Sequence, residues 1–247
     1  MRAHKISPKE RIYSMIKAVI FDMYETLITQ YETPLYFSKE LAEDLGMEVE
    51  AFRKVWFATD YERTVGKREF SEVLTEIAKA EGIYTKEKIT YMLEKTKMQK
   101  KDCFLHLHKE ILPMLSDLKK EGFKVALISN CYVEEAAVIR ESVLFPYFDV
   151  AMLSCEVGVC KPEKEIFTMC MDALGVKESE CLYVGDGGSR ELEVTKTLGL
   201  HPVQAAWYLK KGAYGQMERK EDFENVESPS NILKIAQGLN VQTKKTI

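Results

Sequence analysis

Short continuous apolar runs and helically spaced apolar residues alternate along most of this chain. Five short apolar runs, rich in β-branched residues, have the pattern of strands buried on both faces of a parallel sheet. They lie at residues 17–21, 124–128, 150–153, 182–184 and 203–206. Segments with apolar residues three or four positions apart, typical of helices, lie between them at 111–121, 133–142, 164–174 and 191–198. This alternation predicts an α/β fold, with a doubly wound parallel sheet and right-handed crossovers.

Between the first two predicted strands the spacing is helical throughout. Four helical segments begin near Phe37, Phe52, Phe70 and Lys86, and Gly46 stops the first of them. We therefore predict a core domain made of residues 1–30 and 105–247, with a helical domain, 31–104, inserted after the first strand.

The two ends of the chain have weaker patterns. Residues 1–14 read as a polar leader, and the tail, 216–247, is mostly polar. Within that tail, Ile232, Leu233 and Ile235 are spaced to dock one final helix on the core.

Composition excludes several classes of protein. The 247 residues are 46% hydrophobic and 30% charged, which is typical of a globular chain. A net charge of −4 without long charge runs argues against a nucleic-acid partner. No apolar stretch is long enough to span a bilayer and the first residues lack the apolar segment of a signal peptide, so we expect a cytoplasmic location. The six cysteines have no metal-like spacing, and we expect them to be reduced and mostly buried.

Four predicted strands are followed by polar residues of definite types. In chain order these are Asp22 and Thr26, Ser129 and Asn130, Lys161 with Pro162, and the segment Gly185-Asp186-Gly187-Gly188-Ser189. Because the carboxyl ends of parallel strands line one crevice, these groups should converge there. A strand-end aspartate such as Asp22 is suited to chemistry, although it also suits a turn-capping role.

The predicted crevice holds two carboxylates, a lysine and a hydroxyl group. Asp22 and Asp186 would repel one another, and a divalent cation with oxygen ligands relieves such repulsion. We therefore expect magnesium at this site, where it would neutralise a phosphate while Asp22 attacks. Lys161 and Ser129 would hold the remaining phosphate oxygens.

These motifs resemble those of the haloacid-dehalogenase superfamily of hydrolases, in the subfamily with a helical C1 cap. The similarity runs from residue 17 to residue 206 and implies a Rossmann-like core, a cap that selects a small-molecule substrate, and Mg²⁺ as cofactor. It implies that Asp22 is the nucleophile, that Thr26 positions its loop, and that Lys161 orients Asp22. The implied metal ligands are Asp22, Asp186 and the main-chain carbonyl of Tyr24. The implied substrate-binding residues are Tyr24, Ser129, Asn130 and Lys161.

Tyr24 departs from the phosphatase pattern. Phosphatases of the superfamily carry a second aspartate two residues after the nucleophile, as general acid and base, whereas this position is Tyr24 here. A phenol that titrates near pH 10 is a poor replacement at neutral pH. Tyrosine at this position resembles the metal-independent 2-haloacid dehalogenases instead. The glycine-rich turn at Asp186 resembles the magnesium-binding form, so the two positions disagree.

Two glutamates add alternatives. Glu191 is either an outer magnesium ligand or a favourable acid in the first turn of a helix. Glu25 stands where glycine is common, and we do not expect it to supply the missing carboxylate, because alternate residues at a strand end point in different directions.

Three functions remain open from the sequence. The leading hypothesis is a magnesium-dependent phosphatase that acts on a small phosphorylated metabolite through an aspartyl-phosphate on Asp22. The alternatives are a metal-independent 2-haloacid dehalogenase and a non-catalytic protein that binds a ligand or a partner. Arg53, Tyr61, Arg63, Lys67 and Arg68 are candidate contacts of the inserted helices with an anionic substrate group.

Overall fold

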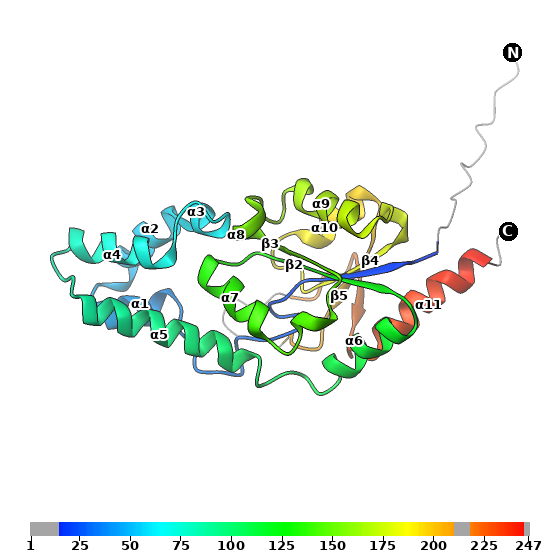
Figure 1. Ribbon diagram of the computed structural model, residues 1–247, viewed down its shortest axis with the longest axis horizontal. Helices are drawn as coiled ribbons and strands as arrows, with labels where there is room; N and C mark the ends of the chain where they lie inside the picture. The colour runs from blue at the N-terminus through cyan, green and yellow to red at the C-terminus, as the bar shows by residue number, and fades with distance from the viewer. Residues whose placement is uncertain (1–14, 210–217, 245–247) are drawn as a thin grey trace, which may run out of the picture.

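Six parallel strands form a single sheet at the centre of the structure, a computed structural model that describes residues 15–209 and 218–244 (Figure 1). The strand order is β3-β2-β1-β4-β5-β6. The strands are β1 (Ala18–Phe21), β2 (Lys124–Ser129), β3 (Val150–Leu153), β4 (Cys181–Gly185), β5 (His201–Ala205) and β6 (Glu224–Val226). The predicted Rossmann-like α/β fold is confirmed. The predicted polar leader, 1–14, lies outside the described residues.

Helices cover both faces of the sheet because successive strand residues point to opposite sides. In β1, Val19 and Phe21 pack toward one helical layer, and Ala18 and Ile20 pack toward the other. The first layer contains α6 (Ile111–Lys120), α7 (Val133–Glu141) and α11 (Asn231–Lys244). The second contains α9 (Lys164–Leu174) and α10 (Glu191–Leu198), which lie above the sheet in Figure 1.

Two parts of the core were not anticipated from the pattern. The tail contributes not only the predicted helix, α11, but also β6, which pairs with β5 at the edge of the sheet. β6 has only three residues, Glu-Asn-Val, so it lacks the apolar run by which the other strands are recognised. The short helix α8 (Ser154–Val157) and the 3-10 turns Phe145–Tyr147 and Glu178–Glu180 also lacked a signal.

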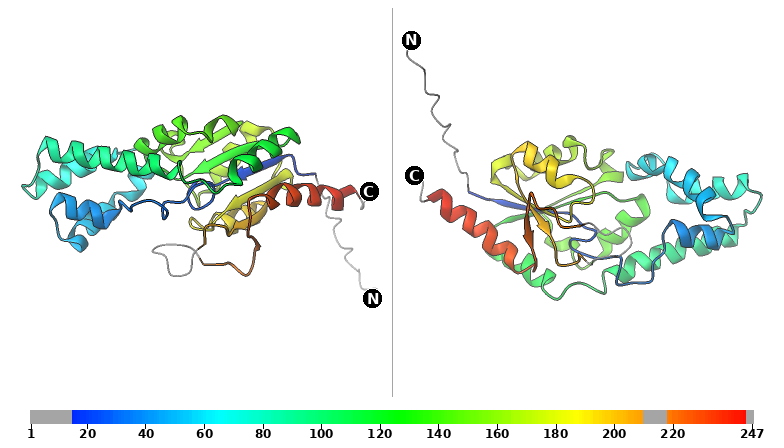
Figure 2. Two further views of the ribbon diagram at one scale, coloured as in Figure 1. Left: turned by 90° about the horizontal axis from the view of Figure 1, so that it is seen from below. Right: turned by 180° about the vertical axis from the view of Figure 1, so that it is seen from behind.

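Five helices lie between β1 and α6 and extend away from one end of the sheet (Figure 2). They are α1 (Ser38–Leu45), α2 (Val49–Ala58), α3 (Asp60–Thr64), α4 (Phe70–Ala80) and α5 (Lys86–Cys103). We call them the helical insertion. The four predicted helices are present, and α3 is additional because its charged sequence has no apolar spacing. The insertion has its own apolar core, which includes Leu45, Phe52, Leu74 and Met92.

Polar contacts tie the helical insertion to the core beside α7 and α8. The Tyr132 hydroxyl donates to Asp60 Oδ1 at 2.6 Å, and the Ser154 hydroxyl donates to the Thr64 carbonyl at 2.7 Å. The Arg63 guanidinium is fully buried and stacks on the Tyr132 ring at 4.8 Å. No helix in the described ranges has both the length and the apolarity to span a bilayer.

The backbone of the insertion lies close to that of the core at Gly66, and this contact generates a stability prediction. A Cβ atom at Gly66 would lie 2.0 Å from the Cys155 carbonyl oxygen, whereas one at Gly82 would have no neighbour within 4 Å. Both glycines have φ of +71°, so alanine costs each about 1–2 kcal/mol of left-handed backbone strain. Gly66→Ala should therefore lower the free energy of unfolding by about 1–3 kcal/mol more than Gly82→Ala, because only Gly66→Ala adds overpacking. Urea denaturation of both variants measures this difference. Equal losses of unfolding free energy would show that the contact between Gly66 and Cys155 tolerates an added Cβ atom.

Candidate active site

Asp22 lies at the end of the central strand, where the sequence predicted a reactive carboxylate. Its backbone N–H donates to the Val184 carbonyl at 2.9 Å, which extends the sheet pairing by one residue and fixes the direction of the side chain. Asp22 Oδ1 accepts hydrogen bonds from the Met23 N–H at 2.7 Å and from the Lys161 ammonium at 2.5 Å. Among the described residues, none is recorded as a partner of Asp22 Oδ2. This oxygen is therefore available for attack or for a cation.

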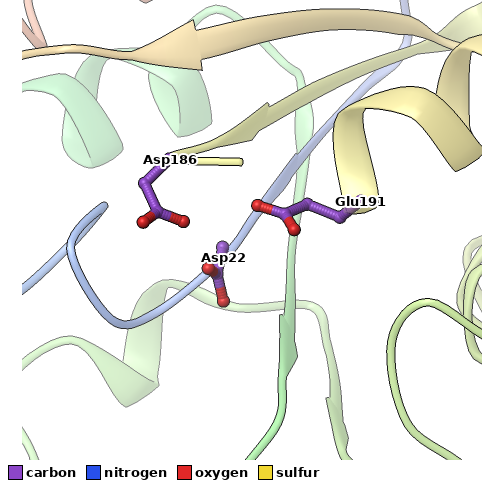
Figure 3. A group of neighbouring side chains, drawn as sticks. All are labelled: Asp22, Asp186 and Glu191. Carbon is purple, nitrogen blue, oxygen red and sulfur yellow. The ribbon is translucent and has the colours of Figure 1, made fainter. Parts of the chain in front are cut away.

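Asp22, Asp186 and Glu191 form a buried carboxylate cluster (Figure 3). One oxygen from each side chain lies within 4.8 Å of the others. Asp186 stands just beyond the end of β4, and Glu191 is the first residue of α10. Topology thus places three acids at one edge of the sheet, as expected for Asp22 and Asp186.

Glu191 holds the glycine-rich turn as well as adding charge. Its two carboxylate oxygens accept hydrogen bonds from the Gly187 N–H at 2.8 Å and from the Ser189 N–H at 2.7 Å. Asp186 Oδ1 accepts a bond from the Gly188 N–H at 3.0 Å, and the Asp186 carbonyl accepts one from Gln204 Nε2 at 2.7 Å. The turn is therefore fixed by its own acids and by β5.

Lys161 provides the positive charge of the cluster. Its side chain is buried and paired with Asp22, and Asn130 holds its backbone from both sides. The Asn130 amide donates to the Lys161 carbonyl at 2.8 Å, and its oxygen accepts from the Lys161 N–H at 2.8 Å. Both polar groups of Asn130 are thus engaged by Lys161, so we propose that Asn130 positions Lys161 in addition to lining the substrate pocket.

Burial and mutual repulsion disturb the ionisation of the cluster. Burial, opposed by Lys161 and reinforced by Glu191, raises the pKa of Asp22 to about 6. Burial, followed by the charges of Asp22 and Glu191, raises the pKa of Asp186 well above its ordinary value. Burial also acts to lower the pKa of Lys161, but the nearby carboxylates outweigh it and the pKa is raised. One lysine therefore does not neutralise three buried acids.

Thr26 and Ser129 are completely buried beside these charges. Among the described residues, the Thr26 hydroxyl has no hydrogen-bond partner, whereas the Thr26 carbonyl accepts a bond from Trp207 Nε1 at 2.8 Å. The Ser129 hydroxyl makes only a long contact, 3.5 Å, with the Asn130 carbonyl. Both hydroxyl groups are thus weakly engaged within the described part of the chain.

Tyr24 and Glu25 follow Asp22 and play different parts. Burial, followed by the charge of Glu135, raises the pKa of Tyr24 well above that of an ordinary phenol, so the group stays protonated. The Glu25 carboxylate accepts bonds from the Thr29 hydroxyl at 2.6 Å and from the Gln30 N–H at 2.9 Å. Glu25 thus stabilises its own loop, in agreement with the expectation that it does not replace the missing acid.

A pocket of about 540 Å³ lies between the core and the helical insertion. Tyr24, Asn130 and Ser189 line it from the core, and Trp56 and Lys100 line it from the insertion. Many of its other walls are aromatic, namely Tyr31, Tyr36, Phe37, Phe57, Phe70 and Tyr132.

Lys100 is a pocket residue that the sequence analysis missed. Its ammonium pairs with Glu135 at 2.8 Å and lies 5.0 Å from the centre of the Tyr24 ring. Lys100 belongs to a lysine-rich part of α5, and spacing alone did not distinguish the inward-facing lysine. Gln204 and Trp207, which hold the Asp186 and Thr26 carbonyls, were missed because they lie far along the chain from both motifs.

The five residues of the helical insertion that were predicted to contact an anionic substrate group lie in different surroundings. Arg63 is buried against Trp56 at 3.5 Å, which makes it part of the packing behind the pocket. Arg53 bonds to Ser38 and Glu50 and lines a separate shallow pocket, and Arg68 pairs with Glu76. Tyr61 is exposed and Lys67 lies over its ring. Within the described part of the chain, none of these five side chains lines the 540 Å³ pocket.

The fold and the site together define a parallel α/β domain with a buried aspartate at the end of its central strand. The family model of the haloacid dehalogenase-like hydrolases matches residues 16–194. The chain belongs to this family, and the resemblance seen in its motifs is confirmed.

Two archaeal phosphatases are similar over most of their length. The glyceraldehyde 3-phosphate phosphatase of Methanopyrus kandleri is 26% identical over 242 residues, which cover 91% of this chain and 99% of that protein. The enzyme of the same name from Methanocaldococcus jannaschii is 26% identical over 212 residues, which cover 84% of this chain and 90% of that protein.

Solved structures of both reaction types share the fold. A phosphatase from Thermococcus onnurineus superposes with a TM-score of 0.62 and 21% identity, covering 90% of this chain and 99% of its own. A 2-haloacid dehalogenase from Pseudomonas syringae pv. Tomato superposes with a TM-score of 0.64 and 20% identity, covering 91% and 99%. At these identities the likeness shows the fold alone.

The carboxylate cluster generates a prediction about cations and pH. Because Asp186 holds its proton more tightly in the folded than in the unfolded chain, its ionisation should destabilise the metal-free protein as pH rises above 3.8. Asp186→Asn should therefore be more stable than wild type in EDTA, with a difference that grows as the pH rises above about 4. Each 1 kcal/mol gained should raise Tm by about 2–4 °C.

Magnesium should reverse this order of stability between wild type and Asp186→Asn. The cation should raise the Tm of wild type at neutral pH, because it neutralises the cluster, and should have little effect on Asp186→Asn. Glu193→Gln is the matched control, since Glu193 lies on α10 two residues after Glu191 but pairs with Lys220 at 2.5 Å. An equal magnesium response in wild type and Asp186→Asn would argue against a cation at this cluster.

Proposed function

We propose that this hydrolase is a magnesium-dependent phosphatase that acts on a small phosphorylated metabolite. The observation that carries the proposal is the cluster of three buried carboxylates around Asp22, paired with a single lysine. A carbon–halogen hydrolase without a metal needs no carboxylates to ligate one, whereas three clustered acids beside one lysine leave negative charge that a divalent cation relieves. The two phosphatases that resemble this chain along nearly all of their length support the same reaction type.

The donor set suits Mg²⁺. Asp22 and Asp186 each keep one carboxylate oxygen that has no recorded partner among the described residues, and hard oxygen ligands are those that magnesium prefers. We propose that these two oxygens and the Tyr24 carbonyl hold the ion, while Glu191 holds the turn and adds charge. Bound magnesium would neutralise charge on the phosphate and on the carboxylates.

The chain's own groups would carry the transfer. The Asp22 carboxylate attacks phosphorus, the bond to the leaving oxygen breaks, and an aspartyl-phosphate forms on Asp22. Lys161 fixes Asp22 Oδ1 and, with the Ser129 hydroxyl, holds phosphoryl oxygens. Water then attacks the phosphorus of this acyl phosphate, the bond to the Asp22 oxygen breaks, and inorganic phosphate and the free Asp22 carboxylate are released. The helical insertion would act as a cap whose aromatic wall excludes solvent from these steps.

Tyr24 limits the range of substrates in this proposal. A phenol with a raised pKa can donate a hydrogen bond, but it does not act as a base at neutral pH. The leaving group must therefore depart with little acid assistance, as that of an acyl phosphate does. Hydrolysis of the aspartyl-phosphate would be slow for the same reason, since no carboxylate stands at this position to activate water.

The first test is phosphate release from phosphate esters and acyl phosphates by wild type and Asp22→Asn. Wild type should release phosphate only with magnesium, and EDTA should stop it. Asp22→Asn should show no release, because an amide cannot form the covalent ester. Absence of phosphate release from the whole panel would overturn the proposed function.

A second candidate, hydrolysis of 2-haloacids, is favoured by Tyr24 alone. The 2-haloacids are assayed beside the phosphate panel. This candidate predicts halide release that persists in EDTA and disappears in Asp22→Asn. This result would show that Tyr24, and not the glycine-rich turn at Asp186, indicates the reaction of this protein.

Tyr24→Asp tests the missing acid directly. The new carboxylate should speed hydrolysis of alkyl phosphates, which have poor leaving groups, by about 10²-fold or more, the usual contribution of general acid–base catalysis. Acyl phosphates should gain less, because they depend less on protonation of the leaving group. Tyr24→Phe is the control, since it keeps the ring beside Lys100 and should leave both rates nearly unchanged. A uniform gain or loss across all substrates in Tyr24→Asp would contradict this role.

A further inference from the structure

Two cysteines face each other where the helical insertion meets the core. Cys131 directly follows Asn130 after β2, is 2% exposed and lines the substrate pocket. Cys155 lies in α8 and is partly exposed. Their sulfur atoms are 3.9 Å apart, close enough to share a hydrogen bond, although neither the fold nor the proposed reaction requires a thiol pair.

The two thiols differ in character. The hydrogen bond from Cys131 lowers the pKa of Cys155, although burial and the charges of Glu156 and Glu135 act in the opposite direction. The same hydrogen bond, together with burial, raises the pKa of Cys131 well above its ordinary value. The more exposed sulfur is therefore also the one that ionises more readily, and thiolates are the reactive form of cysteine.

The other four cysteines lack this combination. Cys103, Cys160, Cys170 and Cys181 are all buried. Burial is the first cause that raises the pKa of each of these thiols. They fit the expected role of reduced core residues.

We propose that Cys131 and Cys155 form a dithiol that reacts with peroxides and closes to a disulfide. Closure requires the sulfurs to approach from 3.9 Å to about 2.0 Å, which rotation of the two side chains would supply in large part. Cys155 is the attacking thiol, and Cys131 is the thiol that resolves the intermediate.

The chemistry balances with one peroxide for each pair. The Cys155 thiolate attacks a peroxide oxygen, an S–O bond forms, the O–O bond breaks, and the departing hydroxide takes up a proton as water. The Cys131 sulfur then attacks the Cys155 sulfur, an S–S bond forms, and the S–O bond breaks. The hydroxide that leaves takes the Cys131 proton and becomes a second water. The two thiols lose two electrons, and the peroxide gains them.

The position of the pair links oxidation to the active site. Cys131 is covalently joined to Asn130, whose amide makes both hydrogen bonds to the Lys161 backbone. A movement of Cys131 toward α8 would pull on Asn130 and thereby displace Lys161 from Asp22. The Cys131 N–H also donates to the Ser154 hydroxyl at 2.9 Å, which in turn donates to Thr64 of the insertion. Closure of the disulfide should therefore lower catalytic activity reversibly.

The experiment treats the reduced full-length protein with hydrogen peroxide and measures intact mass, the disulfide peptide and magnesium-dependent phosphate release. Wild type should lose two hydrogen atoms in mass, yield a Cys131–Cys155 cross-linked peptide, and lose activity that dithiothreitol restores. Cys155→Ser should keep the basal activity, because Cys155 lies outside the proposed catalytic groups, and should resist peroxide. Cys170→Ala, which changes a buried thiol far from the pair in sequence, is the matched control and should respond as wild type does.

A second variant assigns the order of attack. In Cys131→Ser the resolving thiol is absent, so a sulfenic acid should remain on Cys155 and react with dimedone. The proposal is overturned if peroxide yields no Cys131–Cys155 cross-link, if the cross-link leaves activity unchanged, or if Cys155→Ser is inactivated like wild type. The cross-link is read by mass, so failure of the phosphatase assay would count against the proposed function and not against the dithiol.

Discussion

The structure of this site depends on the burial of negative charge at the end of the central strand. Asp22, Asp186 and Glu191 lie together with only Lys161 to offset them, and burial raises the pKa of both aspartates. Most of the neighbouring contacts keep this arrangement in place. Asn130 fixes Lys161, Glu191 fixes the glycine-rich turn, and Gln204 fixes the Asp186 carbonyl. Buried like charges persist only where the surrounding structure holds them and a further cation relieves them, which is why the cluster indicates function rather than stability.

The helical insertion adds a second, different environment above this cluster. Its pocket is largely aromatic, and its one buried lysine, Lys100, is already paired with Glu135. The charged chemistry therefore belongs to the sheet edge, and the insertion contributes shape and exclusion of water. Solved structures of a phosphatase and of a 2-haloacid dehalogenase share this fold at low identity, so the fold alone does not decide the reaction.

Tyr24 lies between these two environments and affects both. In the sequence it occupies the position where phosphatases of the superfamily carry an aspartate. In the structure its side chain forms part of the pocket wall beside Lys100. A protonated phenol there favours substrates with good leaving groups in the proposed phosphatase reaction. The proposed dithiol of Cys131 and Cys155 adds a means of control at the same pocket, one residue away from the Asn130 that holds Lys161.

The sequence by itself determined the alternation of strands and helices along the chain and the residues that follow the strands. Continuous apolar runs mark doubly buried strands; Asp22, Ser129 and Asp186 follow their runs within two residues, and Lys161 comes eight residues after the third run. β6 and α3 were not predictable, because a three-residue edge strand and a charged five-residue helix have no hydrophobic period. Only the tertiary structure decided which lysine of α5 enters the pocket, that Arg63 is buried, and that Cys131 meets Cys155. Those facts depend on distances between segments far apart in the chain, and no local periodicity encodes such distances.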